Sequence, residues 1–362
     1  MPKAVTTLWQ EQYDERVTWV SGLPMMKKSS APTLVDVARN AGVSLKTASR
    51  VLNQSSNVSA KKVARIRAVM EQLGYRPNEL ARGLKARRST AIGMIVPNLA
   101  NPFFSNAVKA VQEGARANGN VVIISSSGGN PDVERSEIET LVRRQIDGLV
   151  LAPADSRVNN LKGVIPTGLP VVTFDAPVRA ARYDSVTVTN RASAREATEH
   201  LLSHGARRIL AIGARPHLYT FAQRISGYRD AMSAAGLEPH ACLVEHESML
   251  TASWLEKQIG GRRPAEAIFS LNWVCTVLIL QALRALGKKV GRDIFLLSFD
   301  DLDLADMLNP PITSVAQPSE TLGTEAIRLL IERLKDGKQS SKAHRIVLPT
   351  RLILRESCGC HR

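Results

Sequence analysis

The sequence predicts an α/β protein in which an N-terminal helix-turn-helix module precedes two doubly wound parallel sheets. Three observations carry this prediction. Basic charge is concentrated in one short segment, the same segment has helix-turn-helix spacing, and the remaining chain alternates short apolar runs with amphipathic helical ones. A chain of 362 residues, 44% of them hydrophobic, is long and apolar enough for two or three packed domains.

The positive charge of the chain is unevenly distributed. The formal net charge is +15. Residues 31–90 hold twelve basic and three acidic side chains, whereas residues 91–362 hold 32 basic and 27 acidic ones. A compact basic module predicts nucleic acid as its partner first and an anionic membrane surface second. The remaining body is nearly neutral, so its function has to be inferred from other features.

Several protein classes are disfavoured by the sequence. No uncharged apolar run is long enough to span a bilayer. The apolar stretch Val17–Met26 is interrupted by Ser21, Gly22 and Pro24, so we expect no secretory signal and no membrane partner. The chain contains four cysteines, which do not suggest a disulfide framework. A reducing cytoplasm, with the protein associated with the nucleoid, is the expected location.

The sequence predicts neither a cofactor nor a metal site. Cys358 and Cys360 lie close to the end of the chain without a histidine or cysteine set at zinc spacing, so a frayed tail with free thiols is favoured over a metal site. His200 and His204 flank a predicted helix end, where ordinary surface histidines are favoured over a metal pair. The chain also lacks phosphate-loop, dinucleotide-binding and nucleophile-elbow motifs, which argues against an enzyme.

Residues 1–30 show no periodicity and are predicted to be a disordered extension. Two alternatives remain open at this point. The segment reflects an upstream start codon, because translation from Met26 leaves the basic module whole, or Leu8–Trp19 forms a short amphipathic helix that binds a partner.

Residues 31–76 are predicted to form the helix-turn-helix module. Thr33 and Asp36 have the spacing of a capping box, so a first helix begins there and ends near Asn40. A three-residue turn follows, and Ser44 is placed to cap a second helix over Leu45–Asn53. A third helix, which begins after residue 59 and ends near residue 74, completes the small core.

The second helix has two faces. Ala48, Val51 and Leu52 share an apolar side that must pack on the first helix. The opposite arc is polar and is free to enter a DNA groove. It consists of Lys46, Ser49, Arg50 and Asn53.

Residues 77–90 are predicted to be a hinge. A short helix over Glu79–Ala86 places Leu80 and Leu84 one turn apart, and Gly83 weakens it. An isolated helix of this length is marginal in water, so we expect it to fold only where something buries its leucines.

The segments Thr33–Asn53, Leu73–Asn78 and Ala81–Leu84 together resemble the headpiece and hinge of the LacI/GalR family of transcription regulators. The resemblance implies that the base-reading residues are Leu45, Lys46 and Arg50, and that Leu84 wedges into the minor groove. It places further DNA contacts at Thr33, Ser49, Asn53 and Ala81. The chemistry agrees, because Lys and Arg donate to guanine acceptors and an apolar wedge kinks DNA.

Residues 91–362 are predicted to hold two parallel sheets with a ligand cleft at the carboxyl ends of the strands. The expected strands are Ala91–Val96, Val121–Ser125, Gly148–Leu151, Val171–Phe174, Ile209–Ile212, Ala267–Phe269 and Phe295–Phe299. The expected helices include Phe103–Asn118, Val133–Arg144, Ala192–His204 and Val274–Leu286.

This body also resembles the family's effector-binding and dimerisation domain, which has the fold of periplasmic sugar-binding proteins. Asn101–Phe104, Gln223–Tyr228, Ser298–Asp301 and Pro310–Gln317 are among the segments that carry the likeness. It implies effector contacts at Phe104, Arg224, Asn272, Trp273, Asp300 and Gln317. A ring can stack on a sugar face, and the polar groups can orient hydroxyls.

Alternatives apply to these candidates. Phe104 fits plain helix core, and Asp300 or Gln317 fits a loop-closing role. Trp273, where the family often has Asp, either adds a second stacking wall or seals the cleft. Two further departures from the family pattern are Thr189, where Asp is usual, and Ser298 with Phe299 in place of Gly-Tyr.

The predicted function is a homodimeric, sequence-specific transcription regulator, favoured to be a repressor. Its affinity for a palindromic operator in double-stranded DNA changes when a sugar or sugar derivative closes the cleft. A periplasmic solute-binding protein shares the expected body but needs a signal sequence and no basic headpiece. An enzyme that uses the cleft needs an acid, base or nucleophile set, and the sequence does not reveal one.

Overall fold

The computed structural model describes residues 32–52, 58–76, 89–157, 161–179, 183–336 and 342–360. The chain divides into two compact units, Met1–Arg82 and Gly83–Arg362, and each is described by itself. The predicted extension over residues 1–30, most of the predicted hinge, and the candidate contacts Asn53, Ala81 and Leu84 lie outside the described residues. Within the described ranges no helix combines the length and apolarity needed to cross a membrane.

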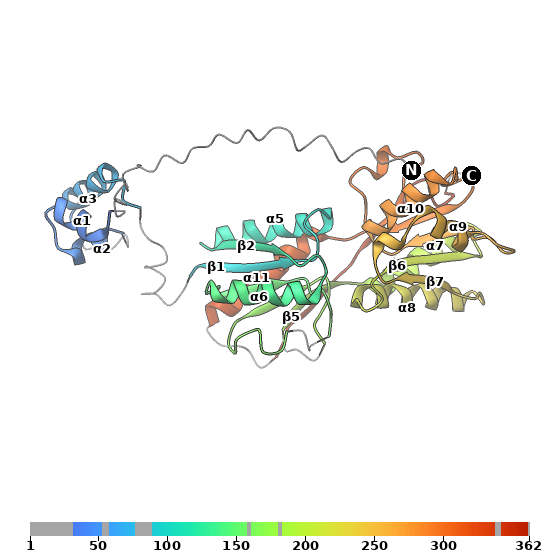
Figure 1. The fold of residues 1–362 in the computed structure, drawn as a ribbon, viewed down its shortest axis with the longest axis horizontal. Helices are drawn as coiled ribbons and strands as arrows, with labels where there is room; N and C mark the ends of the chain where they lie inside the picture. The colour runs from blue at the N-terminus through green and yellow to red at the C-terminus, as the bar shows by residue number, and fades with distance from the viewer. Residues whose placement is uncertain are drawn as a thin grey trace, which may run out of the picture. The chain divides into compact units, whose positions relative to one another are not determined.

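The first unit contains the predicted helix-turn-helix (Figure 1). Its helices are α1 (Leu34–Asn40), α2 (Leu45–Leu52) and α3 (Ala60–Gln72). The capping box at α1 is confirmed, since the Thr33 hydroxyl oxygen accepts from the Asp36 amide and the Asp36 carboxylate accepts from the Thr33 amide. The Ser44 hydroxyl accepts from the Thr47 amide at the start of α2, as predicted.

The small core of this module lies where the three helices meet. Gly42 has φ +60°, a conformation that favours glycine, and it lets the chain reverse between α1 and α2. The fully or nearly fully buried residues of this core are Val37, Ala41, Val51 and Ile66. The apolar side of α2 is therefore fixed against its neighbours, as the spacing predicts, and its other side is left to solvent.

The second unit contains two six-stranded sheets in the described part of the chain (Figure 1). The first sheet has the order β11-β5-β4-β3-β1-β2, and its pairs are parallel. Its strands are β1 (Ala91–Val96), β2 (Val121–Ser126), β3 (Gly148–Leu151), β4 (Val171–Phe174), β5 (Asp184–Val188) and β11 (Arg345–Leu348).

The second sheet has the order β12-β10-β9-β8-β6-β7. Its pairs are parallel except the pairing of β10 with β12, which is antiparallel. Its strands are β6 (Ile209–Ala214), β7 (His240–Val244), β8 (Ala267–Ser270), β9 (Phe295–Phe299), β10 (Thr313–Ala316) and β12 (Arg351–Ile353).

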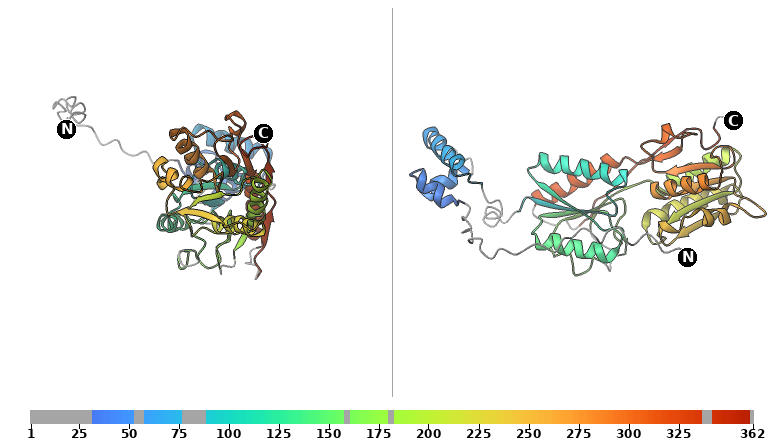
Figure 2. Two further views of the ribbon diagram at one scale, coloured as in Figure 1. Left: turned by 90° about the vertical axis from the view of Figure 1, so that its right-hand side faces the viewer. Right: turned by 45° about the horizontal axis from the view of Figure 1, so that its top comes forward.

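Helices cover both faces of each sheet, as doubly wound folds require. The right-hand view of Figure 2 shows the two sheets, each between helices. In the first subdomain, α5 (Pro102–Ala117) and α11 (Ser319–Asp336) pack on one face and α6 (Pro131–Arg143) on the other. In the second, α7 (Asn190–Ser203) and α8 (Tyr219–Ala234) lie opposite α9 (Ala252–Ile259) and α10 (Trp273–Ala285). Two 3-10 turns, η2 (Glu247–Met249) and η3 (Ala305–Met307), complete the described elements.

The two subdomains are interleaved in sequence. The described chain passes from one sheet to the other after β5, after β10 and after β11. Each subdomain therefore contains segments that are far apart along the chain. The three connections between the sheets are the places about which the two subdomains can move relative to each other.

All seven predicted strands are confirmed, with shifts of one or two residues at some ends, and five further strands were not predicted. Strand β10 was missed because it is polar for an interior strand. Its Thr313 and Ser314 are fully buried but donate hydrogen bonds from their hydroxyl groups to Cys358 Sγ and to the Asp301 carboxylate. Strand β5 begins at buried Asp184, whose carboxylate is paired with Arg333 of α11 at 2.7 Å.

The expectation of a frayed C-terminal tail is wrong for the described residues up to 360. Ser357 and Cys358 are fully buried. The Ser357 hydroxyl donates to the Leu296 carbonyl at 2.6 Å and accepts from the Thr313 amide at 2.8 Å. These hydrogen bonds hold the tail against the second sheet.

Helices α7 and α8 approach closely at Gly227, where a Cβ atom would lie 2.0 Å from the Arg191 carbonyl oxygen. We expect Gly227→Ala to lower the free energy of unfolding by at least about 2 kcal/mol, because the methyl group would push two backbones apart. Denaturant titration of the purified variant measures this change.

Ser233→Ala is the matched control, since Ser233 is exposed on the same helix. It is expected to change the free energy of unfolding by less than about 0.5 kcal/mol. Equal effects of the two substitutions would contradict the close packing of α7 on α8.

Candidate functional site

The candidate nucleic-acid interface is the solvent face of α2. Ala48 and Val51 are buried, whereas Lys46 and Arg50 are exposed and Leu45 keeps 49% of its surface exposed. An exposed leucine beside Lys46 is suited to apolar contact with a thymine methyl group. The structure thus brings the three predicted base-reading side chains onto one free face.

The structure gives less direct support for the other predicted DNA contacts that it describes, Ser49 and Thr33. Ser49 is only half-buried on α2. Thr33 is exposed at the start of α1, but its hydroxyl proton is donated to Asp36 Oδ2 at 2.7 Å. This hydrogen bond and the one from the Thr33 amide lower the pKa of Asp36. Thr33 therefore acts as a helix cap in this structure, and a phosphate contact would have to share or replace that role.

The candidate effector site is a cavity of about 380 Å³ between the two sheets of the second unit. Its lining comes from the carboxyl ends of strands in both sheets and from the first turns of helices. The lining residues are Pro97, Asn98, Asn101, Phe103, Phe104, Ser126, Gly128, Pro153, Asp175, Arg215, Leu218, Thr220, Phe221, Arg224, His246, Glu247, Asn272, Val274, Asp300 and Gln317. This is the place where open α/β sheets bind ligands.

Five of the six predicted effector contacts line this cavity, namely Phe104, Arg224, Asn272, Asp300 and Gln317. Trp273 is not among the lining residues. As the first residue of α10, it contributes its backbone amide, which donates to Asp300 Oδ2 at 2.9 Å. The structure therefore gives no support for its indole as a second stacking wall.

Arg224 of α8 is the buried centre of the site. Its Nε donates to Asn190 Oδ1 at 2.8 Å, and its Nη1 donates to the Leu271 carbonyl at 2.6 Å. Its guanidinium carbon lies 3.7 Å from the centroid of the Phe299 ring, a cation–π contact. Burial lowers the pKa of Arg224, while Asp300 and Asp175 raise it. These contacts fix the guanidinium in one orientation at the cavity wall.

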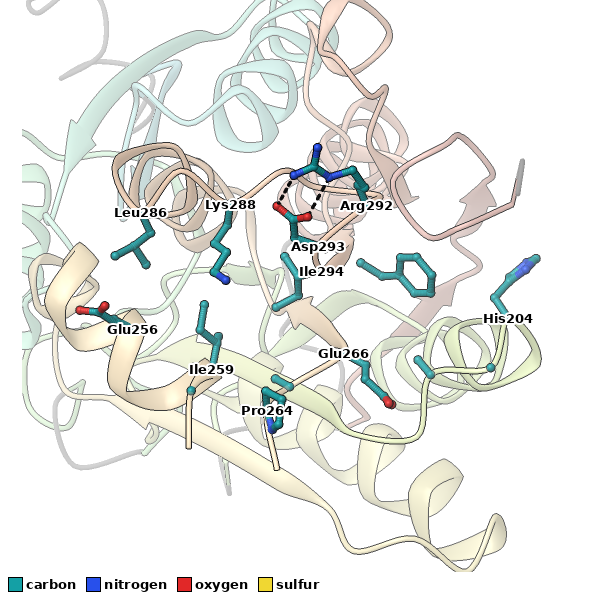
Figure 3. Close-up of a pocket in the computed structure, with 15 residues that line it drawn as sticks. His204, Glu256, Ile259, Pro264, Glu266, Leu286, Lys288, Arg292, Asp293 and Ile294 are labelled. Carbon is teal, nitrogen blue, oxygen red and sulfur yellow. Dashed lines mark hydrogen bonds and ion pairs between the residues drawn. The ribbon is translucent and has the colours of Figure 1, made fainter. Parts of the chain in front are cut away.

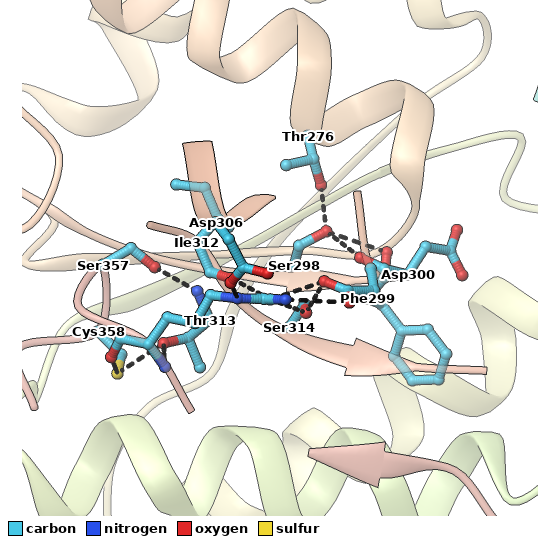
Figure 4. Close-up of polar contacts among 12 residues, drawn as sticks. Thr276, Ser298, Phe299, Asp300, Asp306, Ile312, Thr313, Ser314, Ser357 and Cys358 are labelled. Carbon is cyan, nitrogen blue, oxygen red and sulfur yellow. Dashed lines mark hydrogen bonds and ion pairs between the residues drawn. The ribbon is translucent and has the colours of Figure 1, made fainter. Parts of the chain in front are cut away.

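Asp300 is held in place from three sides. The Gln317 amide nitrogen donates to Asp300 Oδ1, and the Trp273 amide donates to Oδ2. The Ser298 hydroxyl donates to the Asp300 carbonyl at 2.8 Å and contacts Thr276 (Figure 4). Asp300 has φ +82°, a strained conformation for a residue with a side chain, which is common at functional sites.

One acceptor in this wall is unused. Gln317 Oε1 is buried and has no hydrogen-bond partner among the described residues. A buried oxygen without a partner costs free energy, so a donor from a bound molecule would be favourable there. A hydroxyl group could meet this need.

Asp175 follows β4 in the first sheet and faces the same charge cluster. Burial raises the pKa of Asp175 to about 7, Arg224 lowers it, and Asp300 raises it. Burial likewise raises the pKa of Asp300 despite Arg224. Asp175 is partly buried, whereas Arg224 and Asp300 are buried. One cation beside two carboxylates carries a net charge of −1 when all are ionised, which disfavours ionisation of both carboxylates.

Arg215 bridges the two subdomains beside the cavity. Its Nε donates to Glu247 Oε1 at 2.9 Å within the second subdomain, and its Nη1 donates to the Gly129 carbonyl at 2.9 Å in the first. The Gly128 carbonyl accepts from Nη1 and Nη2 at 3.3 Å. We call these contacts of Arg215 with Gly128 and Gly129 the cleft latch. The latch joins the two subdomains beside the cavity.

Phe104 belongs both to the core and to the cavity wall. It is 8% exposed and packs in the core of the first subdomain, with its ring centroid 6.2 Å from that of Phe174. Phe103 meets it edge to face at 4.9 Å and also lines the cavity. Phe104 is thus a core residue that also borders the cavity, and its contact with an effector stays a prediction.

Sequence reasoning missed several lining residues. Asp175 and Arg215 each directly follow a strand, as Asp300 and Gln317 do, and His246 and Glu247 come shortly after β7. Polar residues at the carboxyl ends of predicted parallel strands are a usable signal for such sites. That signal was available for Asp175 and Arg215, but not for Glu247, because β7 itself was not predicted.

A second, larger hollow of about 700 Å³ lies at the amino ends of strands in the second sheet (Figure 3). Two of its three acidic side chains, those of Glu266 and Asp293 but not that of Glu256, have partners among the described residues. Glu266 accepts from the backbone amides of Arg207 and Arg208, and Asp293 is paired with Arg292. We therefore place the effector in the cleft rather than in this hollow, because ligands of open parallel sheets bind at the opposite strand ends.

Comparison with known proteins identifies both kinds of domain in this chain. Residues 33–78 match the model of "bacterial regulatory proteins, lacI family", and residues 198–358 match that of "periplasmic binding protein-like domain". The HTH-type transcriptional regulator DegA of Bacillus subtilis is 31% identical over 330 residues, which cover 90% of this chain and 97% of DegA. The ribose operon repressor of Haemophilus influenzae is 30% identical over 337 residues, or 90% of this chain and 98% of that protein.

A solved structure supports the same conclusion over most of the chain. The complex of the transcriptional regulator CelR with cellobiose has a TM-score of 0.63 and 28% identity, and the match covers 90% of this chain and 99% of that one. With an exposed basic recognition helix, two interleaved parallel sheets and relatives that match along nearly their full length, this chain belongs to the LacI family of DNA-binding transcription regulators.

Proposed function

We propose that this regulator is a repressor whose affinity for its operator is controlled by a sugar or sugar derivative bound in the cleft. The observation that carries the proposal is the composition of the cavity wall, which takes polar side chains from both subdomains. A ligand that contacts both walls favours one degree of cleft closure, and it can thereby shift the DNA-binding equilibrium.

The chemistry of the wall favours a polyhydroxylated ligand, including a sugar acid. Arg224 offers fixed donors, Asp300 and the unpartnered Gln317 Oε1 offer acceptors, and Phe104 offers an apolar surface. Hydroxyl groups both donate and accept, so they match such a mixed set. The H. influenzae relative is named for the ribose operon, and the CelR structure contains cellobiose, which supports a sugar.

The functions of the protein are assigned to segments with the boundaries that the sequence predicts. We assign DNA reading to residues 31–76, the hinge to residues 77–90, and effector binding and dimerisation to residues 91–362. A homodimer presents two recognition helices to a palindromic operator, one to each half-site. Leu45, Lys46 and Arg50 would read bases, Thr33, Ser49 and Asn53 would contact the backbone, and Ala81 and Leu84 would act in the minor groove.

The same proposal assigns no catalysis to the cleft. Both carboxylates near Arg224 are part of one charge cluster, and Asp300 is held by Gln317 and the Trp273 amide. The hydrogen bonds that fix Asp300 suit it to orient a ligand. The protein would act in the cytoplasm, at the nucleoid, where operator DNA is found.

The role of α2 is tested with Arg50→Ala. We expect the affinity for a duplex selected by the wild type to fall about 10- to 100-fold, because a bidentate arginine–guanine contact contributes about 1–3 kcal/mol. Fluorescence anisotropy with the selected and a scrambled duplex measures the change. Lys61→Ala, which removes the same charge from an exposed site on α3, should lower both affinities alike. Unchanged selectivity of Arg50→Ala would contradict the assignment.

The role of the cavity is tested with Asp300→Asn, which keeps the shape of the side chain. The amide would place an NH2 group against either Gln317 Nε2 or the Trp273 amide, so we expect affinity for a sugar found by thermal-shift screening to fall at least about tenfold. Calorimetric titration measures it. Asp303→Asn, on the exposed loop nearby, serves as the control and should bind as the wild type does. An equal affinity of all three proteins would mean that the effector binds elsewhere.

The cleft latch is tested with Gly129→Ala, because a Cβ atom there would lie 1.5 Å from Arg215 Nη1. The arginine must move, and the loss of its charge-assisted hydrogen bonds is expected to weaken effector binding about tenfold or more. Gly119→Ala is the control, since Gly119 has a similar φ of +73° but no atom within 4 Å of an added Cβ. If both variants bind the effector equally, the latch does not contribute to closure.

A further inference from the structure

Two histidines and two cysteines meet where α7 ends against the C-terminal tail. Cys360 Sγ lies 3.3 Å from His200 Nε2 and 3.4 Å from His204 Nε2. Cys358 Sγ lies 3.2 Å from His200 Nε2 and 2.7 Å from Cys360 Sγ. The two pairs are separated by more than 150 residues in sequence, so only the fold brings them together.

The backbone of the tail directs both sulfur atoms to this point. Gly359 has φ +91°, and a Cβ atom there would lie 2.7 Å from the Phe295 ring, so glycine is needed between the two cysteines. Ser357, which precedes Cys358, is fixed because its hydroxyl donates to the Leu296 carbonyl and accepts from the Thr313 amide. The Cys-Gly-Cys turn is thus a built feature of the fold.

The histidines are equally well placed. His200 lies in the last turn of α7 and His204 is its C-cap, so the two are one turn apart on the same side, with ring centroids 4.6 Å apart. The carboxyl end of a helix carries partial negative charge and favours a nearby cation. The sequence alone favoured ordinary surface histidines here, because it could not show the tail folding back onto them.

We propose that His200, His204, Cys358 and Cys360 bind one Zn²⁺ ion as a structural site. Two imidazole nitrogens and two thiolate sulfurs are a preferred tetrahedral ligand set for zinc. With zinc–sulfur bonds of about 2.3 Å and zinc–nitrogen bonds of about 2.0 Å, adjacent ligand atoms are about 3.3–3.8 Å apart. The nitrogen–sulfur distances of 3.2–3.4 Å lie close to this range. His200, Cys358 and Cys360 already hold their ligand atoms within 4.8 Å of one another. To complete the site, the two sulfur atoms must separate by about 1 Å and the His204 ring must turn toward the other three ligands.

The environment suits a closed structural site rather than a catalytic one. All four positions of the ion are taken by protein, and each thiol releases its proton when the metal binds. The Thr313 hydroxyl donates to Cys358 Sγ at 3.0 Å, the kind of outer hydrogen bond that orients a metal ligand. Figure 4 shows this contact beside the hydrogen bond that the Thr313 amide donates to the Ser357 hydroxyl.

The ion would hold the C-terminal tail, which forms ion pairs with the loop that follows β9. Three residues before Cys358, Arg355 is paired with Asp301 at 2.7 Å and also with Asp306. Asp301 adjoins Asp300 in the cavity wall. Zinc would therefore stabilise the loop that follows β9, without taking part in effector binding itself.

The test uses the full chain, purified under reducing conditions, stripped with a chelator and reloaded with Zn²⁺ alone. We expect one zinc per chain by elemental mass spectrometry and a higher Tm with the ion than without it. Substitution of Co²⁺ should give the visible absorption of a tetrahedral ion together with thiolate-to-cobalt charge transfer. Zinc below half an equivalent, or a cobalt spectrum without the charge-transfer band, would overturn the proposal.

Variants separate this site from adventitious binding. Cys360→Ser and His204→Gln change partly or fully exposed side chains, and each should lower zinc affinity at least about tenfold while the far-UV circular dichroism stays that of the wild type. Cys242→Ser removes a cysteine of the same subdomain outside the cluster and should keep the ion. Full zinc affinity in either ligand variant overturns the proposal. So does an intact mass that shows a Cys358–Cys360 disulfide in the freshly reduced protein.

Discussion

The effector subdomains are organised around the burial of one positive charge. Arg224 is removed from water, and a guanidinium in that position is tolerated only when hydrogen bonds and opposite charges surround it. Part of this compensation comes from the second subdomain, through Asp300 and the Leu271 carbonyl, and part comes from Asp175 in the first. The charge of Asp175 therefore links the position of the first subdomain to the charge balance of the cavity.

The parallel sheets explain why these groups meet. In a parallel sheet all carboxyl ends lie at one edge, and the two sheets place those edges on the same cavity. Residues directly after strands, such as Asp175, Arg215 and Asp300, then converge although they are far apart in sequence. All three have positive φ, so the turns after the strands are bent to bring the side chains inward. The strain is compensated by the packing of the strands that precede them.

The sequence was sufficient for features that depend on local pattern. The helix-turn-helix, its capping box and the apolar strands follow from periodicity and from single side chains such as Thr33 and Ser44. It failed where stability comes from distant partners. Strand β10 is polar because Ser357 and Asp301 satisfy it, and the buried tail depends on the same contacts. The sequence left the role of Trp273 open, and the structure places its backbone amide on Asp300 while its side chain is not among those that line the cavity.

Interleaving of the two subdomains has a consequence for how the protein is made. Strand β11 completes one edge of the first sheet, and β12 completes one edge of the second, yet both lie in residues 345–353. Domains of many proteins fold in order as they leave the ribosome. Here neither sheet has its full set of strands until this late segment has emerged, so both halves of the sensor are finished nearly together. A nascent chain therefore does not hold one complete subdomain beside another that still lacks a strand.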